Sequence, residues 1–191
     1  MNISSSMPTL ASSDALTKSP KQKIFAHQAK VPLEANILYR IERGVVRSIT
    51  WDEEGVPILL GYWAAGDVIG QPLTCVTPYQ LECLTSVEVV ALPIQMWSQV
   101  LEAIALHVQQ TEELLRIASL KPLPVRFWQL LLWLGKKFGR DVAAGRLIDL
   151  KLTHQELAEA VNSTRVTVTR TLQQFEQEGR LVRQKKRLIL P

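Results

Sequence analysis

Short apolar runs, broken by glycine and polar turns, fill the first half of the chain. Apolar residues either alternate with polar ones or follow one another for a few positions, and both patterns are typical of strands. These runs cover residues 36–44, 45–51, 56–63, 67–70, 79–85 and 87–93. EEG (53–55) and AAG (64–66) supply turns between them. Residues 21–93 are therefore predicted to form a β-sandwich or roll.

From residue 94 to about residue 120 the period changes to that of a helix. Apolar or small residues recur at alternating intervals of three and four, the a/d spacing of a coiled-coil seam. They are Leu101, Ile104, Val108, Thr111, Leu115 and Ala118. A long helix with such a seam needs a partner, either the β domain of its own chain or the same helix of a second copy. We favour the second copy, and hence a dimerisation helix at 94–120.

A proline-containing break follows this helix and opens a last segment, residues 121–191. KPLP (121–124) interrupts helical structure, because proline lacks the amide donor and disfavours helix in the residue before it. This makes it a hinge candidate. Residues 125–138 are then apolar around most of a helical surface, which indicates the core helix of a C-terminal domain.

Residues 152–179 have the pattern of a helix-turn-helix. Thr153 and Glu156 have the spacing of a capping box at the start of a first helix. Asn162 tolerates the left-handed conformation of a sharp turn, and Ser163 or Thr164 can cap the next helix. Apolar residues at helical spacing give each helix a buried face: Leu157, Ala158 and Val161 in the first, and Val168, Leu172 and Phe175 in the second.

The other face of the second helix carries side chains suited to a DNA groove. They are Arg165, Thr167, Thr169, Arg170 and Gln173. An arginine there can bind O6 and N7 of a guanine, and threonines suit phosphates and thymine methyl groups. An ordinary helical hairpin with a solvated polar face is the alternative for this pattern taken alone.

The flanking segments turn the helix pair into a winged helix. Residues 145–152 alternate as a strand that leads into the first helix, and residues 181–190 form two short strands around Lys185 and Lys186. The two lysines are either a charged turn or phosphate clamps.

Charge is distributed unevenly along the chain. The net charge is +4, but residues 1–120 hold 8 Lys and Arg against 12 Asp and Glu, whereas residues 121–191 hold 14 against 6. A basic C-terminal third joined to an acidic remainder indicates that the two parts meet different partners. A polyanion is the natural partner of the basic part.

Several classes of protein are disfavoured by what the sequence lacks. No apolar run has the length of a membrane span, and residues 1–20 resemble a disordered tail more than a targeting segment, so no membrane is expected and the expected location is cytoplasmic. No Ser/His/acid set or phosphate-binding glycine loop is present, and three scattered histidines, His27, His107 and His154, share no motif. An enzyme is not expected, and no cofactor is identified.

Two cysteines lie eight residues apart without a CxxC motif. Cys75 and Cys83 are expected to be buried, reduced thiols, with a redox switch or a metal site as the alternative. No metal site is predicted.

The order of elements resembles the Crp/Fnr family of bacterial transcription regulators: a β-roll, a dimerisation helix, a hinge and a winged helix. The glycines of RIERGVVR and AAGDVIG stand where the roll of that family turns. IDLKLTHQELAEAVNSTRVTVTR (148–170) is most similar to the global nitrogen regulators of cyanobacteria, which share the STRVTVTR core. The resemblance implies an α+β fold with a cyclic-nucleotide-binding-like roll.

The resemblance also implies a set of DNA contacts. Arg165, Val166 and Arg170 match the base-reading positions of the family, with a GTA/TAC palindrome in double-stranded DNA as the implied target. Phosphate-gripping positions correspond to His154, Gln155, Thr164, Thr167, Lys185 and Lys186. The loop before the first wing strand, here about residues 139–146, corresponds to an activating patch that contacts RNA polymerase, which favours an activator.

The sensory half departs from the family pattern. QPLTCVTPYQLECLT replaces the segment that carries the arginine for a cyclic phosphate, so cyclic nucleotides are not expected. Alignment with the nitrogen regulators makes His107, Thr111 and Glu112 the candidate effector residues, with His107 in place of an arginine. A neutral histidine is a poor clamp for a dicarboxylate, so His107 is expected at the helix surface.

Two further expectations concern the roll. About two strands of the family pattern are missing before Asn36, so its pocket is expected to be reduced or absent. No cysteine precedes Cys75, which excludes the family's iron–sulphur sensing, and haem ligation by Cys75 or His107 is not favoured. A ligand-independent or non-specific, chromosome-associated DNA-binding protein with a degenerate sensor is the alternative function.

Overall fold

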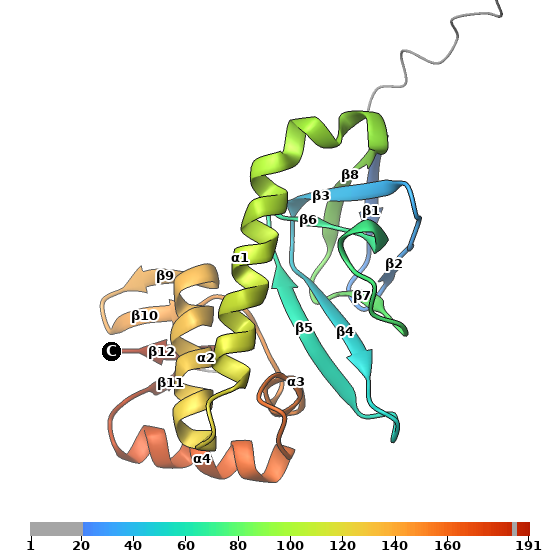
Figure 1. Cartoon of the computed structure of the whole chain (residues 1–191). Helices are drawn as coiled ribbons and strands as arrows, with labels where there is room; N and C mark the ends of the chain where they lie inside the picture. Colours follow the sequence, from blue (N-terminus) through green and yellow to red (C-terminus); the bar gives the residue numbers. More distant parts are fainter. Residues whose placement is uncertain (1–20, 185–186) are drawn as a thin grey trace, which may run out of the picture.

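The computed structural model describes residues 21–184 and 187–191, in two halves that pack side by side along the helix α1 (Figure 1). The N-terminal half is built from two antiparallel sheets, and the C-terminal half from three helices and a small antiparallel sheet. The predicted tail (1–20) and the two wing lysines, Lys185 and Lys186, lie outside the described residues. The predicted α+β class is confirmed.

Eight strands form the roll as two four-stranded sheets. One sheet has the order β1 (Lys21–Phe25), β8 (Val87–Pro93), β3 (Ile37–Arg43), β6 (Val68–Ile69). The other has the order β2 (Lys30–Val31), β7 (Gln80–Cys83), β4 (Val46–Trp51), β5 (Pro57–Trp63). A short 3₁₀ helix, η1 (Gln71–Leu73), follows β6. Their inward side chains make the apolar core of the roll, which includes the fully buried Tyr39 and Trp63.

Two strands, β1 and β2, precede Asn36, where about two strands of the family pattern were expected to be missing. β1 contains only two apolar residues beside three polar ones, so its own pattern is weak. It is a strand because it pairs along its whole length with β8, a partner far away in the sequence. The turn glycines behave as predicted: Gly44, between β3 and β4, has a φ of 89°, and a Cβ there would lie 2.2 Å from the carbonyl oxygen of Ser86.

The helical segment after the roll has two parts, not one. Ile94–Val100 is a 3₁₀ helix, η2, and the α-helix α1 spans Leu101–Ala118. α2 then spans Leu123–Phe138 and begins two residues earlier than predicted. Pro122 caps it and Pro124 lies in its first turn, where the missing amide hydrogen costs no helical hydrogen bond.

The C-terminal half is a winged helix. Its elements are β9 (Gly139–Val142), β10 (Gly145–Ile148), α3 (His154–Ala160), α4 (Arg165–Gln177), β11 (Val182–Gln184) and β12 (Arg187–Leu190). The strands form a sheet in the order β11-β12-β10-β9. Two expectations are corrected: the strand predicted over 145–152 ends at Ile148, and residues 139–146 contain the hairpin of β9 and β10, not a loop.

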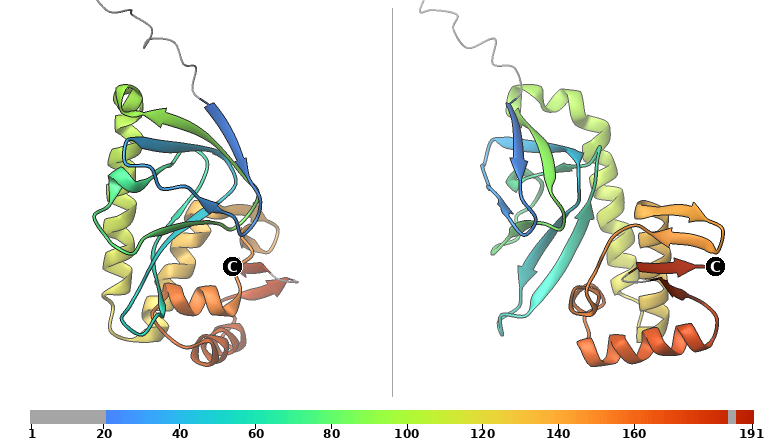
Figure 2. Two further views of the ribbon diagram at one scale, coloured as in Figure 1. Left: turned by 90° about the vertical axis from the view of Figure 1, so that its right-hand side faces the viewer. Right: turned by 180° about the vertical axis from the view of Figure 1, so that it is seen from behind.

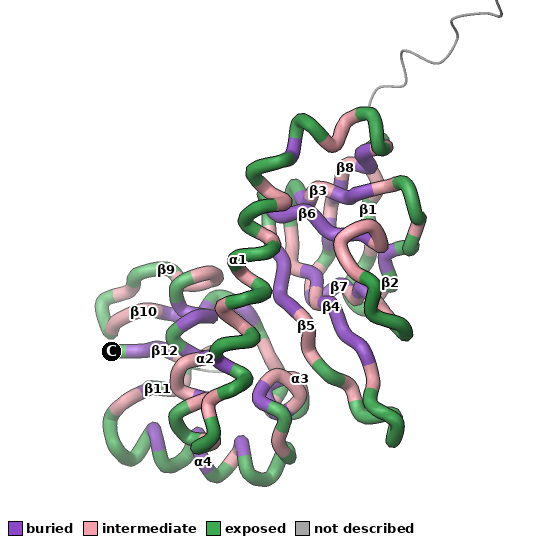
Figure 3. Tube along the Cα trace, viewed as in Figure 1, coloured by how far each residue is buried: buried purple, intermediate pink, exposed green. Residues whose placement is uncertain are grey.

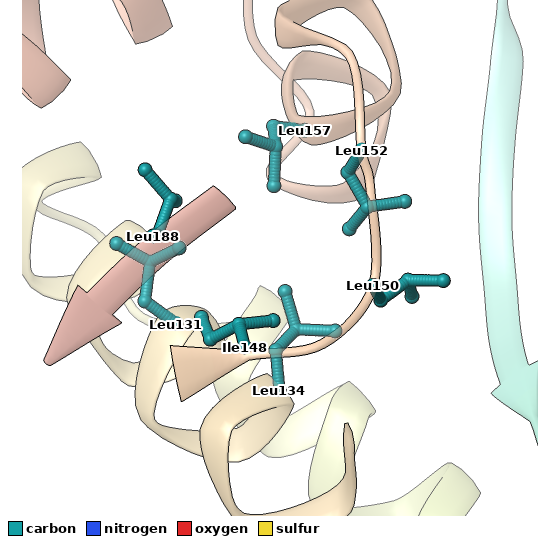
Figure 4. A pocket seen from close by; sticks show the side chains of 7 residues that line it. All are labelled: Leu131, Leu134, Ile148, Leu150, Leu152, Leu157 and Leu188. Atoms are coloured by element: carbon teal, nitrogen blue, oxygen red, sulfur yellow. The ribbon is translucent and has the colours of Figure 1, made fainter. Parts of the chain in front are cut away.

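Leucine and isoleucine side chains hold the winged helix together. Seven of them, from α2, β10, α3, β12 and the segment between β10 and α3, converge in Figure 4. They surround a cavity of about 20 Å³ with little polar surface. A water molecule needs several polar partners to be held in such a space. This cavity is therefore part of the core and not a ligand site.

The two halves are joined by an apolar contact and two largely buried ion pairs. Tyr62 of β5 lies in the same apolar cluster as the core of the winged helix, and α3 packs beside β5 (Figure 2). Lys137 of α2 donates to Asp67 of the roll at 2.5 Å and also to Gln110 of α1. Arg47 of β4 reaches Glu159 of α3 at 2.8 Å. The orientation of the helix-turn-helix relative to the roll is thus set by specific side chains.

Candidate nucleic-acid interface

The predicted caps and turn of the helix-turn-helix are present. The Thr153 hydroxyl accepts from the Glu156 amide at 3.1 Å, and the Glu156 carboxylate accepts from the Thr153 amide at 2.6 Å. Asn162 has a φ of 47°, the left-handed conformation expected for the turn. Thr164 caps α4 by accepting from the Thr167 amide at 3.2 Å. Local hydrogen bonds therefore fix where both helices begin.

α4 divides into a buried face and an exposed face. Val168, Leu172 and Phe175 have no exposed surface and pack into the core of the winged helix. In Figure 3 the buried positions of α4 face α2 and the exposed ones face away. Arg165, Val166, Arg170 and Gln173 are exposed, and Val166 leaves 59% of its surface in solvent. Most of the surface of this apolar side chain is thus left uncovered by the described chain.

The phosphate-gripping candidates lie at the starts of the two helices. His154 and Gln155 are in the first turn of α3, and Thr164 and Thr167 are at the start of α4, where their hydroxyls lie 2.8 Å apart. Free amides and the helix dipole favour an anion at the start of a helix such as α4. His154, Thr164 and Thr167 thus border α4, whereas the side chain of Gln155 donates to Glu159 within α3.

His154 is tied to the exposed helix by a hydrogen bond. Its Nδ1 lies 2.8 Å from Oγ1 of Thr169, and that hydroxyl donates to the carbonyl oxygen of Arg165 at 2.8 Å. Because the threonine has a single hydroxyl hydrogen, the Nδ1–H of His154 is the donor to it. Nε2 is left as the nitrogen that gains or loses a proton.

Positive charge surrounds this histidine. Partial burial, and the charges of Arg183 and Arg165, lower the pKa of His154 from its ordinary value of 6.5. Arg183 lies on β11 and pairs with Glu176 at 3.1 Å. Arg183 was not among the residues predicted from the sequence, since nothing local distinguishes it from the other wing cations. The structure adds it to the basic surface beside α4.

The seam of α1 is exposed except at one position. Leu101, Val108 and Leu115 leave 63%, 51% and 65% of their surfaces in solvent, and Thr111 and Ala118 are exposed as well. Ile104 differs from the other predicted seam positions, because it is half-buried and packs on an apolar cluster of the roll. The helix therefore has one apolar side covered by its own chain and a second that is free among the described residues.

The three effector candidates come together at a cavity between α1 and the roll. His107, Thr111 and Glu112 line a space of about 260 Å³ that also borders Trp63 of β5. A pocket is therefore present, which contradicts the expectation of an absent one. His107 is not a surface residue either: it is half-buried, and its ring stacks on Trp63 with centroids 3.8 Å apart. Periodicity could not reveal this, because the partner ring lies on another element.

The cysteines do not form a pair. Cys83 is buried and burial raises its pKa to about 11, whereas Cys75 is exposed, which corrects the expectation of two buried thiols. Among the described residues there is no cluster of three metal-ligating side chains. Within that same part of the chain, no helix has the length and hydropathy needed to cross a membrane.

Comparison with known proteins gives relatives along nearly the whole chain. Residues 125–191 match the model of the Crp-like helix-turn-helix domain. The regulatory protein CysR of Synechococcus elongatus is 44% identical over 177 residues, which cover 91% of this chain and 85% of that protein. The global nitrogen regulator of Synechocystis sp. is 31% identical over 165 residues, covering 78% of this chain and 72% of that protein.

Solved structures share the fold. A CRP-family transcriptional regulator from Thermus thermophilus has a TM-score of 0.75 at 25% identity, covering 88% of this chain and 91% of that one. FixK2 from Bradyrhizobium japonicum has a TM-score of 0.74 at 18% identity, covering 91% of this chain and 93% of that one. The second likeness concerns the arrangement of elements alone.

Proposed function

We propose that this chain, which belongs to the Crp/Fnr family of DNA-binding transcription regulators, works as a homodimer that reads a GTA/TAC palindrome. One observation carries the proposal. Arg165 and Arg170 project from the exposed face of a helix whose other face is locked into the core, and neither forms an ion pair within the described chain. Their guanidinium groups are thus free to bind guanine edges.

Val166 supports the same reading of bases. It stands between the two arginines in the sequence and is largely exposed, so its methyl groups are available to a thymine methyl in the major groove. His154, Gln155, Thr164 and Thr167, together with Lys185 and Lys186, are proposed to hold the flanking phosphates. We add Arg183 to this group because it shares the surface with His154.

The homodimer is supported by the seam of α1. Leu101, Val108 and Leu115 are spaced seven residues apart, and each leaves half or more of its surface in solvent when the chain is alone. A second copy packed there, helix against helix, covers them. Two copies then present two α4 helices, which in dimeric readers of this kind enter major grooves about 34 Å apart.

Two further partners complete the proposal. A small-molecule effector binds at His107, Thr111 and Glu112, and it is not a cyclic nucleotide, because no arginine among the described residues lines that cavity. RNA polymerase meets the β9–β10 hairpin, where Asp141 is exposed beside Arg146. The location proposed for such a regulator is the cytoplasm, with no membrane and no catalytic turnover.

Selection from randomised duplex DNA tests the proposed function. The protein should enrich a palindrome with GTA and TAC half-sites whose centres are about one helical turn apart. A double variant, Arg165→Ala with Arg170→Ala, should enrich nothing while its thermal unfolding stays unchanged, since both side chains are exposed. Binding of all sequences alike by the unaltered protein would instead favour the non-specific, chromosome-associated alternative.

DNA affinity is also expected to rise as pH falls, through His154. A phosphate beside the ring favours its protonated form, so the pKa of His154 is higher in the complex than in the free protein, where it lies below 6.5. The complex therefore takes up a proton. The increase in DNA affinity is complete below the pKa that His154 has in the free protein. It is lost as the pH rises through the higher pKa that His154 has in the complex.

Titration of the operator at several pH values between 5.5 and 8 measures this effect. Affinity should increase by about 3- to 10-fold toward the acidic end, since one proton contributes at most tenfold per pH unit. His154→Gln keeps a hydrogen-bonding group that does not titrate, so its profile should be flat. An unchanged slope in that variant would assign the pH dependence to another group.

A further inference from the structure

The cavity between α1 and the roll has a composition that limits what it can bind. Of the described residues around it, half are apolar and one, Glu112, is an acid, while lysine and arginine are absent from the lining. An anion placed there would lose water without gaining a countercharge, which is costly in a partly buried site. The lining instead suits a molecule that is mainly apolar.

The three polar side chains that α1 contributes to the cavity can act as acceptors. Nδ1 of His107 lies 3.0 Å from the carbonyl oxygen of Val68 and donates to it, which leaves Nε2 as the free nitrogen. Burial is the largest influence on the pKa of His107 and lowers it, so the ring stays neutral and Nε2 accepts. The Thr111 hydroxyl already donates to the carbonyl oxygen of His107 at 2.8 Å. Glu112 contributes an acceptor with a negative charge.

One donor that could have served an anion is already engaged. The indole N–H of Trp63 donates to the Ser48 hydroxyl at 2.9 Å. The Thr74 hydroxyl oxygen accepts from the Val76 amide at 3.0 Å, and its O–H remains available as an uncharged donor. Free hydroxyl donors remain, but no cationic donor from the described residues lines the space.

The size of the cavity sets the scale of the ligand. An apolar cavity of about 150 Å³ accommodates benzene, and this one is about 260 Å³, enough for a two-ring molecule. Its lining includes Val108 and Leu115, which are exposed and belong to the seam proposed to receive the second copy. A bound molecule would thus lie against the roll, α1 and the dimer contact at once.

We propose that this cavity binds a small, mainly apolar molecule with an N–H donor group, cationic or uncharged, and that it excludes anions. The inference deepens the effector site of the proposed function, by giving the chemical class of the effector. It also removes dicarboxylates and phosphorylated nucleotides from the candidates.

Three molecules with the same ring and different charge test this inference. Tryptamine is a cation, indole is neutral and indole-3-acetate is an anion. Because all three contain the indole ring, their ring size is the same and their apolar surface is nearly matched. Ligand-observed NMR titrations of the full-length protein without DNA, up to millimolar concentration, give their dissociation constants. Because DNA is absent, failure here is separate from failure of the DNA selection.

Tryptamine should bind most tightly and indole-3-acetate most weakly. Pairing with a partly exposed carboxylate is worth up to about 1 kcal/mol, so tryptamine should exceed indole by about 2- to 5-fold and the anion by about 10-fold. Glu112→Gln should bring tryptamine to the level of indole and leave indole unchanged. Glu102→Gln removes the same charge from an exposed position of α1 outside the cavity and should change nothing.

Three outcomes would overturn the inference. The first is that indole-3-acetate binds as tightly as tryptamine. The second is that none of the three molecules binds at millimolar concentration. The third is that Glu102→Gln and Glu112→Gln have equal effects, which would assign the preference to the overall charge of the protein.

Discussion

Replacing Leu115 with glutamate is expected to convert the dimer into monomers and to reduce operator affinity by about 100-fold or more. Leu115 lies in the exposed seam and leaves 65% of its surface in solvent. In a dimer formed along α1, the variant would bury a carboxylate without a partner on each copy, and such burial costs several kcal/mol. A monomer then holds DNA through one half-site only.

Analytical ultracentrifugation and gel-shift titration on the same samples measure both effects. Leu106→Glu is the matched control, because Leu106 is a leucine on the same helix, 44% exposed, and outside the seam. It should remain dimeric and bind normally. A dimeric Leu115→Glu protein with unchanged affinity would show that the copies meet through another surface.

Removing the Arg165 side chain is expected to cost about 1–3 kcal/mol of operator binding, or about 5- to 150-fold, for each good bidentate pairing with a guanine that it removes. The loss should be specific to one base. DNA competitors altered at the guanine of the GTA half-site should bind the Arg165→Ala protein almost as well as the operator does, because the side chain that distinguished the operator from these competitors is absent. Competition gel shifts measure this discrimination directly.

Two variants separate base reading from charge. Arg165→Lys keeps the positive charge but lacks the planar fork, so it should recover general affinity and not discrimination. Arg116→Ala removes a positive charge from the exposed last turn of α1, outside the helix-turn-helix, and should leave both unchanged. If the Arg165→Ala protein still discriminated against the altered competitors, another residue would have to be the one that reads this guanine.

The helix-turn-helix was predictable because its determinants are local. The capping box of Thr153 and Glu156 and the turn at Asn162 depend on residues within a few positions of one another, and α4 buries the face that its period indicates. The seam of α1 followed from period as well, although period alone could not tell that Ile104 faces the roll.

The features that sequence did not predict depend on distant partners. β1 is a strand because of β8, and His107 is half-buried because Trp63 offers a ring to stack on. β9 has the sequence GRDV, which lacks alternation, and it is defined by pairing with β10. The exposure of Cys75 follows from the course of its loop, which no spacing encodes.

The ion pairs between the two halves affect how the protein should respond to added salt. Arg47 and Glu159 leave only 11% and 10% of their side chains exposed, and Lys137 and Asp67 leave 16% and 11%. Salt screens buried charges much less than exposed ones, whereas contacts to DNA phosphates weaken steeply because counterions are released when they form. Rising ionic strength should therefore release the DNA while the helix-turn-helix stays fixed on the roll, so that the protein leaves its operator in the shape in which it can bind again.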